Sequence, residues 1–81
     1  MQKQRLTLTS MKNAQSGTVI LINGGGGMLG RLEALGIRAG ARITKRSALI
    51  GRGPVIVAVG NTEIAIGYGM ASRILVEVDE H

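Results

Sequence analysis

Four consecutive glycines, residues 24–27, follow an apolar and largely β-branched run at residues 18–22. β-branched side chains favour a strand, whereas glycine allows sharp changes of backbone direction. The sequence therefore predicts a strand that ends before the glycines. Val19 and Leu21 should face the core, and Ile20 and Ile22 on the opposite face should be covered by another part of the chain. The glycines themselves are expected to form a tightly turned or flexible connection.

A short helix is predicted after the glycines. Met28, Leu32 and Leu35 have the i, i+4, i+7 spacing of one helical face. Gly36 suits the left-handed residue that commonly ends a helix, and Ile37 behind it can pack back on Leu32. A helix of about two turns is not stable alone, so tertiary contacts must hold it.

Gly25, Gly27 and Gly30 match the G-x-G-x-x-G fingerprint of dinucleotide-binding folds. That fold also needs a crossover helix and an acidic residue about 20 residues farther on, which binds the ribose. The chain has no Asp or Glu between Glu33 and Glu63, and the predicted helix is too short for a crossover. A phosphate loop is excluded as well, because Arg-Leu follows Gly30 where Lys-Ser or Lys-Thr is required. We therefore expect no nucleotide cofactor.

Short strands separated by glycines make up most of the chain. The expected elements are an extended segment at residues 6–9, strands at 18–22, 41–50, 55–59, 62–66 and 74–78, turns at 10–13, 15–17 and 38–40, and a short helical turn within 67–73. Gly60-Asn61 predicts a two-residue hairpin. In strand 41–50 the alternation places four residues on one face: Ile43, Lys45, Ser47 and Leu49. Strands this short, with thirteen glycines for sharp bends, favour a closed or nearly closed antiparallel barrel.

A chain of 81 residues forms one domain with a small core. Cysteine is absent, which suits a reducing compartment and leaves no thiolate metal site. The sequence shows no secretory signal peptide and no apolar stretch near the roughly 18 residues of a membrane span. We therefore expect a cytoplasmic protein without direct membrane insertion.

The charge of the chain is +5 and is unevenly spread, because residues 1–60 carry nine Lys or Arg against Glu33 alone. A basic body attracts nucleic acid or an acidic protein surface. Tyr68 is the only aromatic residue, so platforms for stacking bases are missing. Nucleic acid is therefore disfavoured, whereas anionic lipid, an acidic protein surface and an ordinary solvated surface without a partner all stay open.

Groups suited to catalysis or metal binding are sparse. His81 is the only histidine, and it lies with Asp79 and Glu80 in an acidic tail that is expected to be solvated. Glu33 is expected to pair with a neighbouring arginine on the helix surface. No ordered cluster of His, Cys or carboxylate residues suits iron. We expect no enzymatic activity, no resident metal and no cofactor.

Five segments, taken in order, carry a family resemblance. They are Leu-Glu-Ala-Leu-Gly-Ile at 32–37, Ala-Gly-Ala at 39–41, Gly-Pro at 53–54, the hairpin at 55–66 and Met-Ala-Ser-Arg-Ile-Leu-Val at 70–76. Their order and spacing resemble the FeoA family over residues 6–78, between a polar tail at 1–5 and the acidic tail at 79–81. The resemblance implies a mainly β, SH3-like barrel of about five short antiparallel strands, with one short α-helix after the first firm strand.

The same domain ends metal-dependent repressors related to the diphtheria toxin repressor. In some of them the loop after the first strand offers ligands to a regulatory metal. Here that loop is the glycine run, which carries no ligand, so the resemblance implies no metal site.

The resemblance also implies a function. It indicates a non-enzymatic cytoplasmic protein that regulates bacterial ferrous iron uptake by docking on the GTP-binding region of a FeoB-like transporter. Candidate contacts are the small, apolar and basic residues Gly26, Gly27, Met28, Leu29, Arg31, Leu32, Arg42 and Arg52. Met28 or Leu29 would be presented beside the glycines, and cations including Lys45 would surround them and steer an acidic surface.

Two other functions stay open at this point. One is a small basic barrel that binds nucleic acid, and the other is a stand-alone regulatory domain related to the repressors. Self-association through apolar strand edges is compatible with each of the three.

Overall fold

The computed structural model of the protein describes residues 3–48 and 52–79. Within these two ranges, six strands form one antiparallel sheet in the order β1-β6-β2-β3-β4-β5. Their bounds are Gln4–Thr7 (β1), Ser16–Ile22 (β2), Arg42–Ala48 (β3), Val55–Val59 (β4), Thr62–Ile66 (β5) and Ile74–Val78 (β6). Three helical segments join them: the 3₁₀ turn η1 (Leu8–Ser10), α1 (Gly26–Ala34) and α2 (Tyr68–Ala71).

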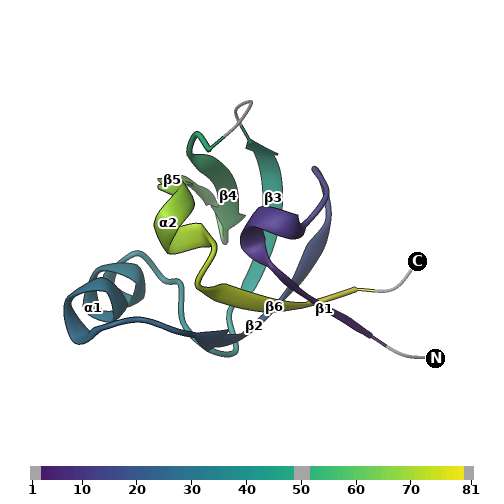
Figure 1. Ribbon diagram of the computed structural model, residues 1–81. Helices are drawn as coiled ribbons and strands as arrows, with labels where there is room; N and C mark the ends of the chain where they lie inside the picture. The colour runs from purple at the N-terminus through teal and green to yellow at the C-terminus, as the bar shows by residue number, and fades with distance from the viewer. Residues whose placement is uncertain (1–2, 49–51, 80–81) are drawn as a thin grey trace.

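The sheet curls on itself, and η1 and α2 lie close together at one side of it (Figure 1). It encloses one aliphatic core. The small β-barrel is thus confirmed, with six strands where about five are predicted. The additional edge strand, β1, includes Gln4 and Arg5, which the sequence assigns to the polar tail. Helix α1 lies at the end of β2, away from the middle of the barrel (Figure 1).

The core contains almost only aliphatic side chains. Leu8, Met11, Val19, Leu32, Ile37, Ile43, Val55, Val57, Ile64, Ile66, Ala71, Ile74, Val76 and Val78 are its buried members. Lys45 is the one buried charged residue among the described residues, with 4% of its surface exposed. The barrel is therefore held by close packing of small and branched side chains, without help from a large aromatic ring.

Strand β2 departs from the predicted alternation. Val19 is opposite Val76 and Leu21 is opposite Leu75, so two steps along β2 match one step along β6. Such a β-bulge places one extra residue in one strand and reverses the side-chain phase beyond it. Val19 is fully buried as predicted, but Leu21 is 55% exposed, and its prediction as a core residue is wrong for this reason.

Helix α1 ends as the sequence predicts. Gly36 has φ +90°, its N–H donates to the Glu33 carbonyl at 2.9 Å, and the Ile37 N–H donates to the Leu32 carbonyl at 2.9 Å. These two bonds form a Schellman motif, in which a left-handed glycine satisfies the last carbonyls of a helix. At the other end, Gly26 already belongs to the helix. The glycine run is therefore partly helical and only partly a connection.

Other local predictions have mixed outcomes. The β4–β5 hairpin turns at Gly60-Asn61 as predicted, with Gly60 at φ +60°. The turn predicted at residues 15–17 is wrong for two of its three residues, because Ser16 and Gly17 lie within β2. Strand β3 contains a bulge between Lys45 and Ser47, which interrupts the predicted shared face. Leu49 lies outside the described residues.

Candidate functional site

Helix α1 carries most of the predicted contact residues. Gly26, Gly27 and Arg31 are exposed, and Leu29 is half-buried. Leu32 is only 1% exposed and packs in the core, so it is unavailable to a partner, and its place among the contact residues is a correction. On the helical face that the spacing of Met28, Leu32 and Leu35 predicts, the middle residue therefore belongs to the core, whereas Leu35 is 50% exposed.

Met28 is half-buried and packs against the core. A Cβ atom added to Gly24 would lie only 2.5 Å from the Met28 methyl carbon, so the methionine folds back over this glycine. A side chain at residue 24 would displace the end of the flexible Met28 side chain, which occupies the space that a Cβ would fill. Met28 thus anchors the beginning of α1 and presents only part of its surface.

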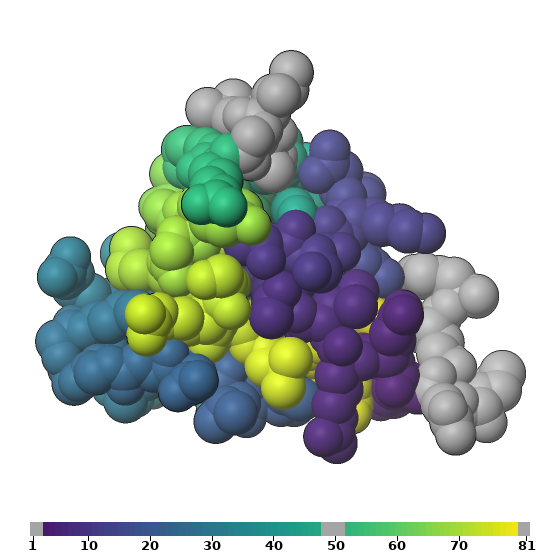
Figure 2. Space-filling model, viewed as in Figure 1, coloured from purple at the N-terminus to yellow at the C-terminus, as the bar shows by residue number. Residues whose placement is uncertain are grey.

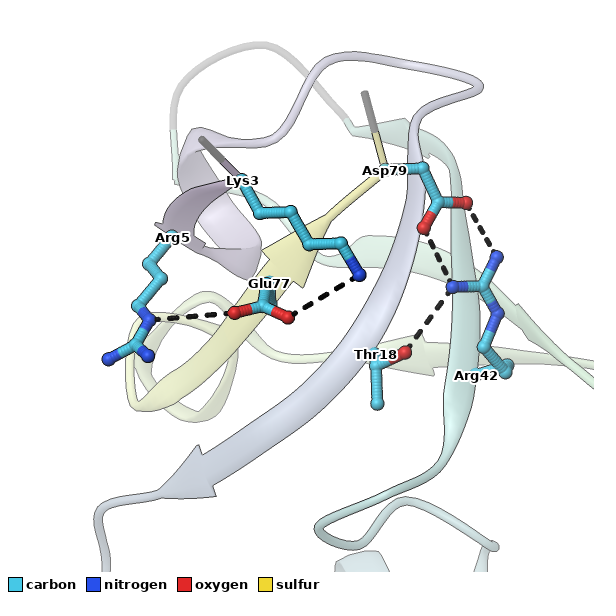
Figure 3. Close-up of polar contacts among 6 residues, drawn as sticks. All are labelled: Lys3, Arg5, Thr18, Arg42, Glu77 and Asp79. Carbon is cyan, nitrogen blue, oxygen red and sulfur yellow. Dashed lines mark hydrogen bonds and ion pairs between the residues drawn. The ribbon is translucent and has the colours of Figure 1, made fainter. Parts of the chain in front are cut away.

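Arg42 has a strong partner of its own. Its Nη1 and Nη2 atoms donate to Asp79 Oδ1 at 2.8 Å and Oδ2 at 2.6 Å, and Nη1 also donates to Thr18 Oγ1 at 3.3 Å (Figure 3). The bidentate hydrogen bond, and then the charge of Asp79, raise the pKa of Arg42 above its usual value. Asp79 is therefore fixed to the barrel, although the sequence predicts a solvated tail there. Glu80 and His81 lie outside the described residues.

The Arg42–Asp79 pair belongs to a row of polar residues across four strands. The register places Arg5 beside Glu77, Glu77 beside Thr18, and Thr18 beside Arg42. Glu77 also lies 3.8 Å from Lys3 Nζ and 3.7 Å from Arg5 Nε (Figure 3). We call this row the polar row, and it joins the beginning of the chain to its end.

Asp79→Ala is expected to release the end of β6 with little change in global stability, since exposed ion pairs contribute little. The Asp79 N–H donates to the Ser16 carbonyl at 2.9 Å, and this bond should open more often without the side-chain clamp. Hydrogen exchange of the amide at residue 79 should become several-fold faster. Glu63→Ala, which removes the separate Arg46–Glu63 pair, is the matched control. An unchanged exchange rate in Asp79→Ala would show that the Arg42–Asp79 hydrogen bonds do not stabilise the end of β6.

Arg52 and Lys45, two other cations that the sequence assigns to the contact surface, make their own contacts with residues outside α1. Arg52 is exposed and stands over the ring of Tyr68, with 5.9 Å between the guanidinium carbon and the ring centroid. Lys45 is buried, so it does not belong to the basic surface that the sequence predicts. The structure thus keeps Arg31 on α1 and gives Arg42 and Arg52 separate local partners.

A shallow hollow opens on the outer face of the sheet, where β1, β2 and β6 meet the end of α2. Its volume is about 210 Å³, and we call it the β6 groove. It is lined by Thr7, Leu21, Asn23, Ser72, Arg73 and Leu75. The groove could not be predicted from the sequence. It depends on the bulge in β2, and the residue types in this strand do not indicate a bulge.

The part of the chain that the structure describes offers no group of three or more His, Cys, Asp or Glu residues placed to hold a metal ion. None of its helices has the length and hydropathy needed to cross a membrane.

Comparison with known proteins identifies a family and solved structures to which this chain is similar. The FeoA domain model matches residues 6–78. The structure is similar to the crystal structure of an iron uptake regulatory protein, FeoA, with 32% identity and a TM-score of 0.87 over 94% of this chain and 100% of that chain. It is also similar to Stenotrophomonas maltophilia FeoA, an SH3 domain protein complexed with zinc, with 23% identity and a TM-score of 0.76 over 93% of this chain and 96% of that chain.

Metal-dependent repressors share the fold. A manganese-dependent transcriptional repressor is 22% identical, with a TM-score of 0.84 over 95% of this chain. IdeR of T. acidophilum is 24% identical, with a TM-score of 0.82 over 98% of this chain. The chain spans 43% of the first repressor and 36% of the second, so this likeness concerns one domain. No curated protein matches the chain in sequence.

Proposed function

The chain belongs to the FeoA family, and from this membership we propose that it is a non-enzymatic cytoplasmic accessory protein of bacterial ferrous iron uptake. In this role it docks on the cytoplasmic GTP-binding region of a FeoB-like transporter and regulates it. The observation that carries the proposal is the family match over residues 6–78, joined by 32% identity to an iron uptake regulatory protein along that protein's whole length.

The exposed face of α1 supports the proposal as a contact surface. Gly26, Gly27 and Arg31 are exposed there, and Leu29 offers part of an apolar side chain beside them. Because glycines have no side chain, a partner can approach the backbone closely at Gly26 and Gly27. The apolar Leu29 beside the cationic Arg31 is complementary to a partner surface that carries both carboxylates and apolar side chains. The net charge of +5 would speed the encounter with such a surface.

Arg31→Glu is expected to weaken binding to the purified cytosolic domain of the transporter by about tenfold, the size of effect given by about 1.4 kcal/mol. The cause is repulsion from an acidic partner surface, so the loss should be larger at low salt than at high salt. Isothermal titration at two salt concentrations measures it. Arg31 is a cleaner test than Arg42, whose reversal would also repel Asp79.

Lys12→Glu makes the same change of charge at an exposed residue between η1 and β2 and serves as the control. Equal weakening by both variants would indicate attraction to net charge alone and no specific role for α1. Undiminished binding of Arg31→Glu would remove α1 from the contact surface.

A further inference from the structure

The bulge in β2 turns a leucine outward. With regular pairing, Leu21 would share the buried face of Val19, but the register shift places it on the outer face, opposite Leu75. Leu21 is consequently 55% exposed in a protein that buries most of its other large aliphatic side chains. β-Bulges commonly re-aim a side chain at functional sites.

Leu21 and Leu75 form the apolar part of the β6 groove. Leu75 is half-buried and lies between Thr7 on β1 and Leu21 on β2 in the sheet register. On the face seen in Figure 2, β6 appears in yellow between the purple N-terminal segment and the blue region around α1. Leu21 and Leu75 are the two apolar residues of the groove, and the other residues that line it are polar: Thr7, Asn23, Ser72 and Arg73.

The charge around the groove is positive. Arg73 lies in the lining, is exposed, and has no ion pair with any residue in the ranges 3–48 and 52–79. The nearby carboxylate of Glu77, in the polar row, is already shared by Lys3 and Arg5. An acidic group entering the groove would thus meet a free guanidinium and no unneutralised carboxylate from this row.

The groove is also continuous with the surface in the proposed function. Only residues 22–25 separate Leu21 from the beginning of α1, and Asn23 in this segment lines the groove. The Asn23 N–H donates to the Arg73 carbonyl at 2.8 Å, which ties this connection to the beginning of β6. A partner that contacts the first turn of α1 therefore lies beside the groove.

We propose that the β6 groove is a second docking site for the same partner, and that it receives a leucine-sized apolar side chain that stands beside a carboxylate. The apolar side chain packs on Leu21 and Leu75, and the carboxylate pairs with Arg73. This inference rests on the proposed function, because it takes the transporter's cytoplasmic region as the source of that segment.

Two leucines of nearly equal exposure provide the test. Leu21 is 55% exposed in the groove, whereas Leu35 is 50% exposed at the end of α1 and does not line it. The purified transporter cytosolic domain is titrated into wild-type protein, Leu21→Asp, Leu35→Asp and Arg73→Glu. We expect Leu21→Asp and Arg73→Glu each to weaken binding at least tenfold and Leu35→Asp to change it less than twofold.

Circular dichroism and thermal unfolding first establish that each variant is folded, and Leu21→Ala replaces Leu21→Asp if the latter is not. Wild-type protein that does not bind the domain overturns the proposed function and the groove with it. Wild-type binding that Leu21→Asp and Arg73→Glu leave intact overturns the groove alone. Loss of self-association in Leu21→Asp, with binding of the domain unchanged, assigns the groove to a second copy of the chain and also overturns the proposal.

Discussion

Gly17→Ala is expected to destabilise the protein by about 3 kcal/mol, because β6 leaves no room for a side chain at this residue. A Cβ atom there would lie 2.5 Å from the Glu77 carbonyl oxygen, 2.6 Å from Val76 Cγ1 and 2.9 Å from Val78 Cα. Two of these three atoms belong to the backbone of β6, which pairs with β1 on one side and β2 on the other. Relief would therefore require the backbone of β2 or β6 to move, and both strands are paired on both sides.

Gly30→Ala provides the matched control, since it makes the same chemical change in open space. Apart from the adjacent residues and the backbone of α1 itself, no atom lies within 4 Å of the added Cβ, and Gly30 is exposed within α1. Alanine is favoured over glycine in a helix by about 0.5–1 kcal/mol, so this variant should be slightly more stable than the wild type. Urea unfolding of both variants measures the two effects, and a small change in Gly17→Ala would contradict the close approach of β2 and β6.

Lys45→Ala is expected to cost about 3 kcal/mol, from lost packing of the buried stem and loss of its hydrogen bonds. Lys45 Nζ donates to the Met11 carbonyl at 2.7 Å and to the Thr9 carbonyl at 3.2 Å. The backbone of Lys45 also bonds to Ala14 and Gln15. Lys45 therefore fastens the whole segment between η1 and β2 to β3. Urea unfolding measures the loss, and Lys12→Ala, at an exposed lysine, should be nearly neutral.

The charge of Lys45 also makes stability depend on pH. Burial lowers the pKa of Lys45 below its ordinary 10.5, because removal from water disfavours the charged ammonium form. Between this lowered pKa and 10.5, the unfolded chain binds more protons at Lys45 than the folded protein does. Stability from this group therefore rises as pH increases through that window. The neutral amine still has N–H groups to donate to both carbonyls.

Lys45→Met keeps most of the stem and removes the titrating group. The difference in unfolding free energy between wild type and Lys45→Met should grow in favour of the wild type as pH increases from neutral toward 10.5. Lys12→Met, at an exposed lysine, should show no such trend. A difference that stays constant across this range would show that burial does not perturb Lys45.

Local signals in the sequence were sufficient for the helix end and the hairpin. The Schellman motif at Gly36 and the turn at Gly60 each depend on residues within a few positions of one another, and each is confirmed. The order of such segments also identified the family, which the domain match confirms. Short-range patterns thus predicted the barrel and its single longer helix.

The missed features all depend on contacts between distant strands. The sequence predicts a turn at Gly17, but this glycine lies in β2 and leaves space for the close approach of β6. The sequence predicts that Leu21 is in the core, but the bulge in β2 turns its side chain outward. Lys45 reads as a surface cation until the segment before β2 covers it. The residues that give these side chains their roles lie 34 (Met11 from Lys45) to 61 (Val78 from Gly17) positions away, a separation that no local periodicity records.

For the site, this means that the sequence predicted the α1 surface and missed the groove beside it. Arg31 and the first glycines of α1 are exposed as a docking surface requires, whereas Leu32 is core. The β6 groove exists because one extra residue in β2 brings Leu21 opposite Leu75 on the outer face.

Docking on the transporter is tested most directly by titrating isotope-labelled protein with the unlabelled cytosolic domain of the FeoB-like transporter and following its backbone amides by NMR. The predicted result is saturable binding, with perturbed amides concentrated in residues 21–31 and 72–75 and little change around Lys12. An unchanged spectrum at saturating concentrations of the domain, or perturbations confined to the opposite side of the barrel, would contradict it.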